Sequence, residues 1–367
     1  MPAVSLYVSS ALGMGNFASG SAVGIAFLST IFSRGWAGKV ADEDGAKSGT
    51  LRGLLLYTLA SLLCLVSTLL VGQDSTAAYV VLLIGRLLLG LGESLALIGL
   101  LAWCMSTLGP NRVGLVLSLF GTGIYGAFAL GGPLGLWLIG SCGFTGLFMI
   151  CLSLPLVSAM MLWKTPASQT ANAGARLPFA RVLGLIWRPG VVVGLQGIGF
   201  AALGAFFPLY FLAKGWQGAG FGLTCFGLGF VVVRLFCGNL PDRCGGALVA
   251  LVSLTVEALG QLLLWLAPEP VHAMAGALLT GMGCSMIFPA MGAEAVKRVP
   301  LHLRGTAIFG VAVFQDLAYG TTGPLAGLVA DRFGYPPIFL IGAVAAGISA
   351  FLVLGFRSNK AAPQDST

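Results

Sequence analysis

Long apolar runs alternate with short polar turns along almost the whole chain. A helix that crosses a bilayer needs about 20 mostly apolar residues, and isolated strands cannot satisfy their backbone groups in lipid. Each run therefore predicts a membrane-spanning helix. The expected spans are about 14–36, 51–72, 77–103, 113–139, 143–163, 190–212, 217–239, 247–267, 271–296, 305–329 and 336–356. The pattern predicts an all-α integral membrane protein with eleven full spans.

A charged stretch at residues 33–47, SRGWAGKVADEDGAK, separates two of these runs. One arginine, two glycines and one aspartate of this stretch recur 200 positions later. The matched pairs are Arg34 and Arg234, Gly38 and Gly238, Asp42 and Asp242, and Gly45 and Gly245. Four matches at one offset predict two copies of one unit, each with a short charged hairpin between two spans. An ordinary solvated loop is the alternative, although a plain loop would not repeat its glycine spacing.

The beginning of the chain departs from this repeat. Residues 1–10, MPAVSLYVSS, are apolar but far too short to span a bilayer. Leu6-Tyr7 corresponds to Leu209-Tyr210, which follows a full apolar run in the second copy. We therefore expect the first span of the first copy to be largely missing, through truncation or a misplaced start.

The repeat divides the chain into two helix bundles. Residues 1–163 should form the first bundle, with its first helix truncated, and residues 190–357 the second. Residues 164–189 are polar at first, then basic and amphipathic, and are expected to be a cytoplasmic linker. Either an interfacial helix near 178–187 or disorder is open for this linker. The tail, residues 358–367, is expected to be disordered in the cytoplasm.

Composition indicates which solvent the protein faces. Hydrophobic residues make up 57% of the 367 residues and charged residues only 8%, against about 25% charged residues in ordinary globular domains. So few charges cannot cover a soluble surface, and the lipid bilayer must surround most of the chain. The net charge is +7, and the basic residues stand singly at span ends. This distribution indicates membrane topology and argues against nucleic-acid binding.

The basic residues also orient the chain in the membrane. When the loops are assigned alternately to the two sides, sixteen of the nineteen Lys and Arg residues fall on one side. The positive-inside rule makes this side cytoplasmic. The linker and the C-terminus are therefore expected in the cytoplasm.

Two charged side chains in one predicted span are candidate functional residues. Arg86 and Glu93 are seven residues apart, so they share a helix face and lie about 10 Å apart along its axis. Each ionised group at mid-membrane costs about 2.5–3.5 kcal/mol, so each needs a partner, a cavity or a substrate. Their counterparts 191 positions later, Ala277 and Cys284, are uncharged. A static ion pair between helices is the alternative to a functional role.

Other acidic residues also fall within predicted spans. Asp316, in VFQDLAYG, has the apolar Ile124 as its approximate counterpart in the first half, and it is a second candidate for proton exchange. Glu257 lies within the expected span 247–267. Glu294, beside Lys297, is expected to form a salt-bridged gate or a helix-end pair.

Several motifs are missing from the sequence. No GxxxxGK[ST] pattern is present, so ATP is not the expected energy source. No nucleophile elbow or paired His/Asp set appears, which argues against an enzyme. The two histidines and eight cysteines lack ligand spacing, so we expect no metal site and no other cofactor.

Four segments carry a family resemblance. They are GKVADEDGAK, its weaker copy GNLPDRCGG, RLLLGLGES with Arg86, Gly90 and Gly92, and GIYGAFALGGPLG with Gly126, Gly132, Pro133 and Gly135. In order and spacing they resemble the second-to-third-helix loop, the fourth helix and the fifth helix of the major facilitator superfamily. GES in the fourth span, and FPAMGAEAVKRVP through FQDLAYGTTGPLAG further along the chain, resemble its bacterial sugar- or drug-efflux branch, which includes YhhS-like and YfcJ-like proteins.

This resemblance implies a fold of two pseudo-symmetric six-helix bundles and a function. The protein would be a monomeric, multi-pass secondary transporter of a bacterial inner membrane, moving a small-molecule substrate by alternating access, with proton-coupled efflux as the favoured direction. Arg86, Glu93 and Asp316 would serve substrate binding or proton coupling, whereas Glu257 would lie in a peripheral helix, with little functional weight. The repeated loop would be a conformational latch, with tight turns at Gly38 and Gly45, and the fifth-helix motif would kink its helix.

One alternative stays open. The short first span favours a non-transporting membrane receptor or assembly partner, built on a truncated facilitator fold.

Overall fold

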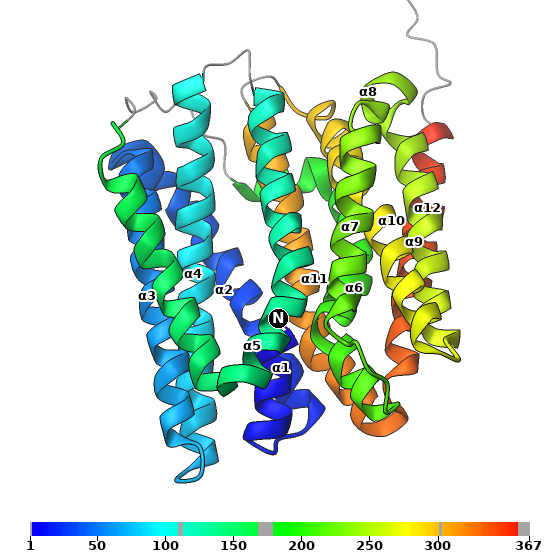
Figure 1. The fold of residues 1–367 in the computed structure, drawn as a ribbon. Helices are drawn as coiled ribbons and strands as arrows, with labels where there is room; N and C mark the ends of the chain where they lie inside the picture. The colour runs from blue at the N-terminus through cyan, green and yellow to red at the C-terminus, as the bar shows by residue number, and fades with distance from the viewer. Residues whose placement is uncertain (1, 109–112, 168–178, 301–302, 359–367) are drawn as a thin grey trace, which may run out of the picture. The chain divides into compact units, whose positions relative to one another are not determined.

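The computed structural model describes residues 2–108, 113–167, 179–300 and 303–358. Within these residues all secondary structure is helical (Figure 1). The elements are α1 (Pro2–Leu6), the π-helix η1 (Tyr7–Ala11), α2 (Asn16–Glu43), α3 (Ala46–Leu70), α4 (Ser75–Leu108), α5 (Val113–Trp163), α6 (Phe179–Ala213), α7 (Phe221–Cys237), α8 (Leu240–Cys244), α9 (Gly246–Leu266), α10 (Pro270–Val296), α11 (Arg304–Phe333) and α12 (Pro336–Ser358).

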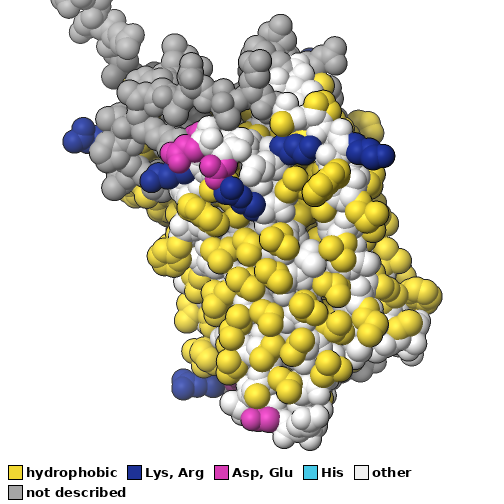
Figure 2. Space-filling view, turned by 90° about the vertical axis from the view of Figure 1, so that its left-hand side faces the viewer, with side chains coloured by type: hydrophobic (Ala, Val, Ile, Leu, Met, Phe, Trp, Pro, Cys, Tyr) yellow, Lys and Arg dark blue, Asp and Glu magenta, His cyan; other side chains and the backbone are white. Residues whose placement is uncertain are grey.

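The helices have the lengths and compositions of membrane spans. Eight helices in the described part of the chain are long and apolar enough to cross a membrane: α2, α3, α4, α5, α6, α9, α10 and α12. The helix α5 is two arms joined at Gly143, whose φ of 68° interrupts the helical backbone between two expected spans. On the face seen in Figure 2, hydrophobic side chains form a broad band and charged side chains gather at its ends. The prediction of an all-helical membrane protein is confirmed.

The chain divides into two compact units. Unit 1 contains residues 1–175, 204–224 and 319–335, and unit 2 contains residues 176–203, 225–318 and 336–367. In unit 1, α4 packs against both α2 and α3, and in unit 2, α9 packs against both α10 and α12. We describe each unit separately.

The short N-terminal segment is firmly packed in unit 1. Tyr7 is 1% exposed, and its ring meets Phe144 and Phe148 of α5 edge-on, with centroids 5.2 and 5.6 Å away. Its hydroxyl lies 2.9 Å from Ser67 Oγ of α3. The described part of the expected first span is thus a short helix followed by a π-helix, anchored on α3 and α5.

Close glycine contacts repeat between the units. A Cβ on Gly92 of α4 would lie 2.9 Å from the carbonyl oxygen of Gly53, and one on Gly283 of α10 would lie 2.6 Å from that of Ser253. Gly283 is 191 positions after Gly92, and Ser253 is 200 positions after Gly53. The internal repeat therefore appears in the three-dimensional packing, because repeat-related positions bring two helix backbones close together in each half.

The repeated charged stretch folds differently in its two copies. In the first copy, α2 runs through to Glu43, so Gly38 is helical and the expected tight turn at Gly38 is wrong. The expected turn at Gly45 is confirmed, because its φ is 92° and α3 begins at the next residue. In the second copy, Gly238 lies in a turn after α7, and Gly245, with φ 86°, precedes α9.

Prolines within helices leave carbonyl groups that side chains on other helices satisfy. A proline has no N–H for the carbonyl four residues earlier. For Pro133, Pro155 and Pro289, that carbonyl accepts a hydrogen bond from another helix. The donor–acceptor pairs are Thr224 Oγ1 to Ala129 O (2.8 Å), Ser61 Oγ to Cys151 O (3.2 Å) and Arg234 Nη1 to Ser285 O (3.2 Å). Side chains thus replace backbone donors where no water is present in lipid.

The expected linker and tail are only partly described. Residues 168–178 and 359–367 lie outside the described residues. The segment near 178–187, for which an interfacial helix was one possibility, is helical from Phe179 but continues without a break into α6.

Candidate functional site

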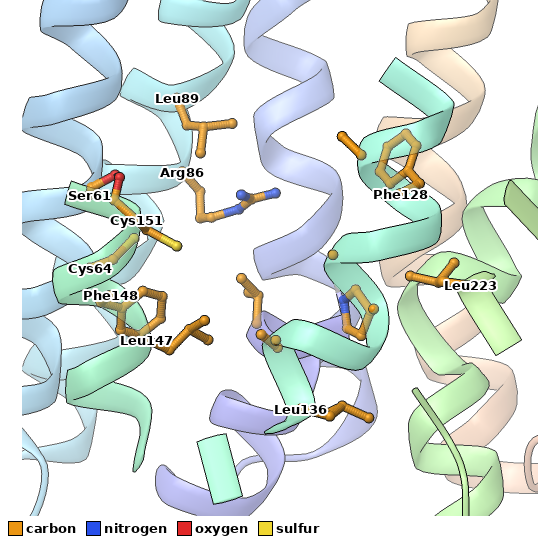
Figure 3. Close-up of a pocket in the computed structure, with 17 residues that line it drawn as sticks. Ser61, Cys64, Arg86, Leu89, Phe128, Leu136, Leu147, Phe148, Cys151 and Leu223 are labelled. Atoms are coloured by element: carbon orange, nitrogen blue, oxygen red, sulfur yellow. The ribbon is translucent and has the colours of Figure 1, made fainter. Parts of the chain in front are cut away.

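A cavity of about 260 Å³ lies in unit 1, lined by α1, α3, α4, α5 and the start of α7 (Figure 3). Its wall is mostly apolar and aromatic, with one charged side chain, Arg86. Its lining residues are Pro2, Ala3, Val4, Ser61, Cys64, Arg86, Leu89, Ala127, Phe128, Gly131, Gly132, Gly135, Leu136, Leu147, Phe148, Cys151 and Leu223. An apolar chamber with a few polar groups is typical of a site for a small organic molecule.

Arg86 lies at the wall of this cavity. Its side chain extends from α4 toward the side where Phe128 lies (Figure 3). Arg86 is only 7% exposed, and Nε and Nη2 donate to the carbonyl oxygens of Ala22 (2.9 Å) and Val23 (3.3 Å) of α2. A guanidinium has five N–H donors, so donors remain for a solute in the cavity.

Glu93 lies two turns further along α4 and does not line the described cavity. It is partly buried and interacts electrostatically with Arg86 and with Tyr57 of α3. Arg86 and Glu93 therefore lie on one helix. Glu93 can influence the charge balance at the cavity without touching a solute there.

Asp316 is buried in α11 and belongs to unit 2. The structure therefore brings Arg86 and Glu93 together in unit 1 but places the third candidate in the other unit. Asp316 remains a candidate on the grounds of its burial and its acidic character alone.

The latch candidates lie at the ends of helices. Arg34 and Asp42 are partly buried on α2, and Asp44 forms an ion pair with Arg52 at the start of α3. Lys47 Nζ donates to the carbonyl oxygens of Trp163 (2.8 Å) and Thr165 (2.6 Å), so the turn is tied to the end of α5. In the second copy, Arg234 satisfies the carbonyl that Pro289 leaves free, and the side chain of Asp242, on α8, lies outside the described atoms.

The fifth-helix motif contacts the segment before α7. Gly126, Gly132, Pro133 and Gly135 all keep helical backbone within α5. A Cβ on Gly132 would lie 2.8 Å from the carbonyl oxygen of Gly220. Gly132 and Gly135 also line the cavity, so this motif couples the cavity wall to the neighbouring segment.

Sequence reasoning missed Asp331. Its carboxylate accepts hydrogen bonds from the backbone N–H groups of Asn16 and Phe17 (both 3.1 Å) at the start of α2, and from Asn16 Nδ2 (2.9 Å). The Tyr335 hydroxyl donates to Asn16 Oδ1 at 2.8 Å. Burial raises the pKa of the Tyr335 phenol, although the bond to Asn16 opposes this, so the phenol keeps its proton as a donor.

Comparison with known proteins identifies the family. The sequence matches the Major Facilitator Superfamily over residues 1–223 and 190–367. The chain belongs to this superfamily. It is 43% identical to the uncharacterized MFS-type transporter STM4428 of Salmonella typhimurium, over 95% of this chain and 89% of that protein. It is 38% identical to the uncharacterized MFS-type transporter YhhS of Escherichia coli, over 98% of this chain and 87% of that protein.

Solved structures of transporters share the fold. A D-xylose–proton symporter has a TM-score of 0.79 at 15% identity, covering 96% of this chain and 93% of its own. The nucleoside transporter NupG has a TM-score of 0.76 at 16% identity, covering 96% and 94%. The predicted superfamily and its YhhS-like branch are confirmed. The chain is a multi-pass membrane protein of a secondary-transporter family and not an enzyme.

Proposed function

We propose that this chain exports a small organic solute across the bacterial inner membrane in exchange for protons, by alternating access. The observation that carries the proposal is the cavity of about 260 Å³ with one buried cation, Arg86, in an otherwise apolar wall. Such a chamber suits a solute with an apolar body and a hydrogen-bond acceptor or negative charge opposite Arg86.

The direction of transport rests on the fifth-helix motif. At Pro133, the bond to the carbonyl of Ala129 comes from the Thr224 side chain and not from the helix backbone. A bond of this kind can break and re-form while the helix stays intact. It supports a movable contact at the motif that exporters and antiporters share with this chain.

Coupling to protons needs a carboxylate whose charge changes during transport. Glu93 interacts with the cavity arginine, and Asp316 is buried in α11. We assign the coupling proton to one of these two acids, with Arg86 adjusting the charge balance around Glu93. The repeated charged turn is the latch that holds one state, through Arg34 and Asp42 in the first copy and Arg234 and Asp242 in the second.

The proposed topology has two helix bundles, residues 1–163 and 190–357, with eleven full spans. It adds α7, α11 and the second arm of α5 to the eight helices that meet the length and hydropathy criteria. Labelling of single cysteines at positions 170 and 365 from the cytoplasm, and at Asp74 and Glu269 from outside, tests this orientation. Periplasmic labelling at 170 would contradict it.

The function is tested in vesicles with an acidic interior and an internal pH dye. A panel of an impermeant aromatic sulfonate, a sugar and an organic amine is added outside. We expect at least one solute to enter and dissipate the pH gradient with the wild type. Glu93→Gln or Asp316→Asn should abolish that coupling and leave at most solute-for-solute exchange, while Glu269→Gln, an exposed acid, should transport normally. If both neutral variants still concentrate solute from the pH gradient alone, the coupling assignment is wrong.

A further inference from the structure

Unit 2 contains a buried polar cluster around Glu257 that the proposed transport mechanism does not use. Glu257 was expected in a peripheral helix with little functional weight, but it is 0% exposed at the middle of α9. Gln196 of α6, Gln261 of α9, and Thr280 and Cys284 of α10 are buried beside it. Five polar side chains at one depth of an apolar unit call for a physical reason.

Direct contacts hold the cluster together. Gln196 Nε2 donates to Cys284 Sγ at 3.0 Å and faces Glu257 Oε1 at 3.5 Å. The Cys284 thiol also lies beside the carboxyl group of Glu257. Gln261 Nε2 donates to Thr280 Oγ1 at 3.3 Å. The carboxyl group thus sits where α6, α9 and α10 meet.

Two glycines make room for the cluster. A Cβ on Gly199 of α6 would lie 3.1 Å from Glu257 Oε1 and 2.9 Å from Gln261 Nε2. A Cβ on Gly342 of α12 would lie 2.6 Å from Gln261 Oε1. Residues of four helices, α6, α9, α10 and α12, therefore pack around the cluster.

The described cluster provides no positive charge to compensate an ionised Glu257. Among the described residues, Glu257 Oε2 and Gln261 Oε1 are buried without a hydrogen-bond partner. The groups that face the carboxyl are the Gln196 amide from α6 and the Cys284 thiol from α10. The Gln261 amide, on α9, lies with Glu257 Oε1 around Gly199, and Gly342 of α12 packs against Gln261. None of these groups carries a positive charge, so an ionised carboxylate here would be strongly unfavourable.

The repeat shows that an acid at this level is not confined to unit 2. Glu257 stands 200 positions after Tyr57, and Cys284 stands 191 positions after Glu93. In unit 1 the acid comes from α4 and faces Tyr57 on α3, whereas in unit 2 the acid comes from α9 and faces Cys284 on α10. Both units thus place a carboxyl group between equivalent helices, but unit 2 seals it completely.

We propose that Glu257 is a proton-binding site, a neutral carboxylic acid that keeps its proton on Oε2 at pH 7 while α6, α9 and α10 stay packed. Separation of α6 from α9 admits water, and the O–H bond breaks as the proton passes to a water molecule. The carboxylate that remains is solvated by that water and by the Gln196 amide. This site is additional to the coupling acids Glu93 and Asp316, and its occupancy does not depend on solute transport.

Infrared difference spectroscopy of the purified protein in lipid, in H₂O and D₂O at pH 7, tests the proposal directly. We expect a C=O stretching band of a protonated carboxylic acid that Glu257→Gln removes and Glu269→Gln leaves in place, because Glu269 is exposed at the start of α10. The proposal is overturned if the spectra of the wild type and Glu257→Gln have the same protonated-acid band.

A variant that leaves the carboxyl intact guards against a folding defect in Glu257→Gln. Cys284→Ala removes the neighbouring thiol, so the band should shift in frequency without disappearing. An unshifted band would overturn the assignment to Glu257. Thermal unfolding in sodium and in choline salts distinguishes a proton from a metal cation. We expect equal Tm values in the two salts, and a sodium-dependent Tm that Glu257→Gln abolishes would also overturn the proposal.

Discussion

The interface of α3 with α4 in unit 1 and that of α9 with α10 in unit 2 have matching close glycine contacts but carry different polar groups. We call these matching contacts the glycine frame. A Cβ on Gly85 would lie 3.0 Å from Ala60 O, and one on Gly276 would lie 2.8 Å from Gly260 O. These positions are related by the offsets of 191 and 200 that also relate the other matched contacts. Close backbone packing has thus been kept in both halves of the chain.

The polar groups differ in both identity and exposure. Unit 1 has Arg86 at the wall of a cavity, whereas unit 2 has Ala277 at the matching position. Unit 1 has a partly buried acid, Glu93, whereas the acid of unit 2, Glu257, is sealed. The glycine frame therefore sets the helix spacing in both units, while the side chains between the glycines differ in charge and exposure.

Adding a methyl group at the repeat-related glycines Gly90 of α4 and Gly281 of α10 should have the largest effect, and the effect should be equal in the two units. A Cβ on Gly90 would overlap the Ala26 carbonyl, and a Cβ on Gly281 would overlap the Phe226 carbonyl. Backbone atoms cannot move aside, so Gly90→Ala and Gly281→Ala should each lower the free energy of unfolding by about 3 kcal/mol or more. Denaturant unfolding in detergent measures this.

A matched control separates crowding from the loss of glycine itself. Gly35 is helical in α2 with open space at its Cβ position, so Gly35→Ala should be neutral or stabilising by about 0.5–1 kcal/mol. Unequal losses for Gly90→Ala and Gly281→Ala would show that the two frames are not equivalent.

Removing the charge that distinguishes unit 1 should come next in size. Arg86→Ala should lower the transport rate by about tenfold or more, which corresponds to at least about 1.4 kcal/mol of lost interaction with the solute. Arg86→Lys should recover only part of the rate, because an ammonium cannot hold two carbonyls in the planar geometry of a guanidinium. Vesicle transport at matched protein amounts measures both, and full activity of Arg86→Lys would argue against the predicted geometry.

The proline contact in unit 1 should have a moderate effect. Thr224→Val leaves the Ala129 carbonyl without its donor and should lower the free energy of unfolding by about 1 kcal/mol. In the Pro133→Ala background the same change should have almost no effect, because an alanine N–H restores the helix bond. A double-mutant cycle that shows no coupling between the two positions would remove this role of Thr224.

The two charged turns should differ by the smallest amount. Asp42→Asn should slow transport by roughly threefold, in the range expected for a solvent-accessible charge interaction, while membrane insertion stays normal. Asp242→Asn should have less effect, because the second copy has Cys244 and Ala247 where the first copy has Asp44 and Lys47. Equal rates for wild type and Asp42→Asn would exclude the latch.

The sequence predicted the parts of the fold that depend on local periodicity and on the repeat. Apolar runs located the helices, and the repeated charged stretch indicated the duplication that the matched glycine contacts at Gly92 and Gly283 show. Arg86 could be assigned to a site because an arginine inside an apolar run needs a partner. Gly38 was assigned wrongly because a helix tolerates a glycine that the loop pattern also accepts.

Other features depend on contacts that no local spacing reveals. Asp331 and Asn16 are 315 positions apart, and Thr224 reaches a carbonyl on another helix because Pro133 freed it. The cluster around Glu257 depends on glycines in two other helices, because Gly199 lies against Glu257 and Gln261 and Gly342 lies against Gln261. Only the packed structure shows these relations.

The cap that Asp331 places on α2 has a consequence for the synthesis of this protein. The first amides of a helix have no partner within it, and here residues 16 and 17 obtain theirs from residue 331. At about 5–20 residues per second, the ribosome reaches residue 331 roughly 15–60 s after residue 16. During that interval the Asp331 carboxylate does not yet exist, so the first amides of α2 have to find other partners, such as water. The nascent chain therefore passes through a long-lived state in which this end of α2 is open.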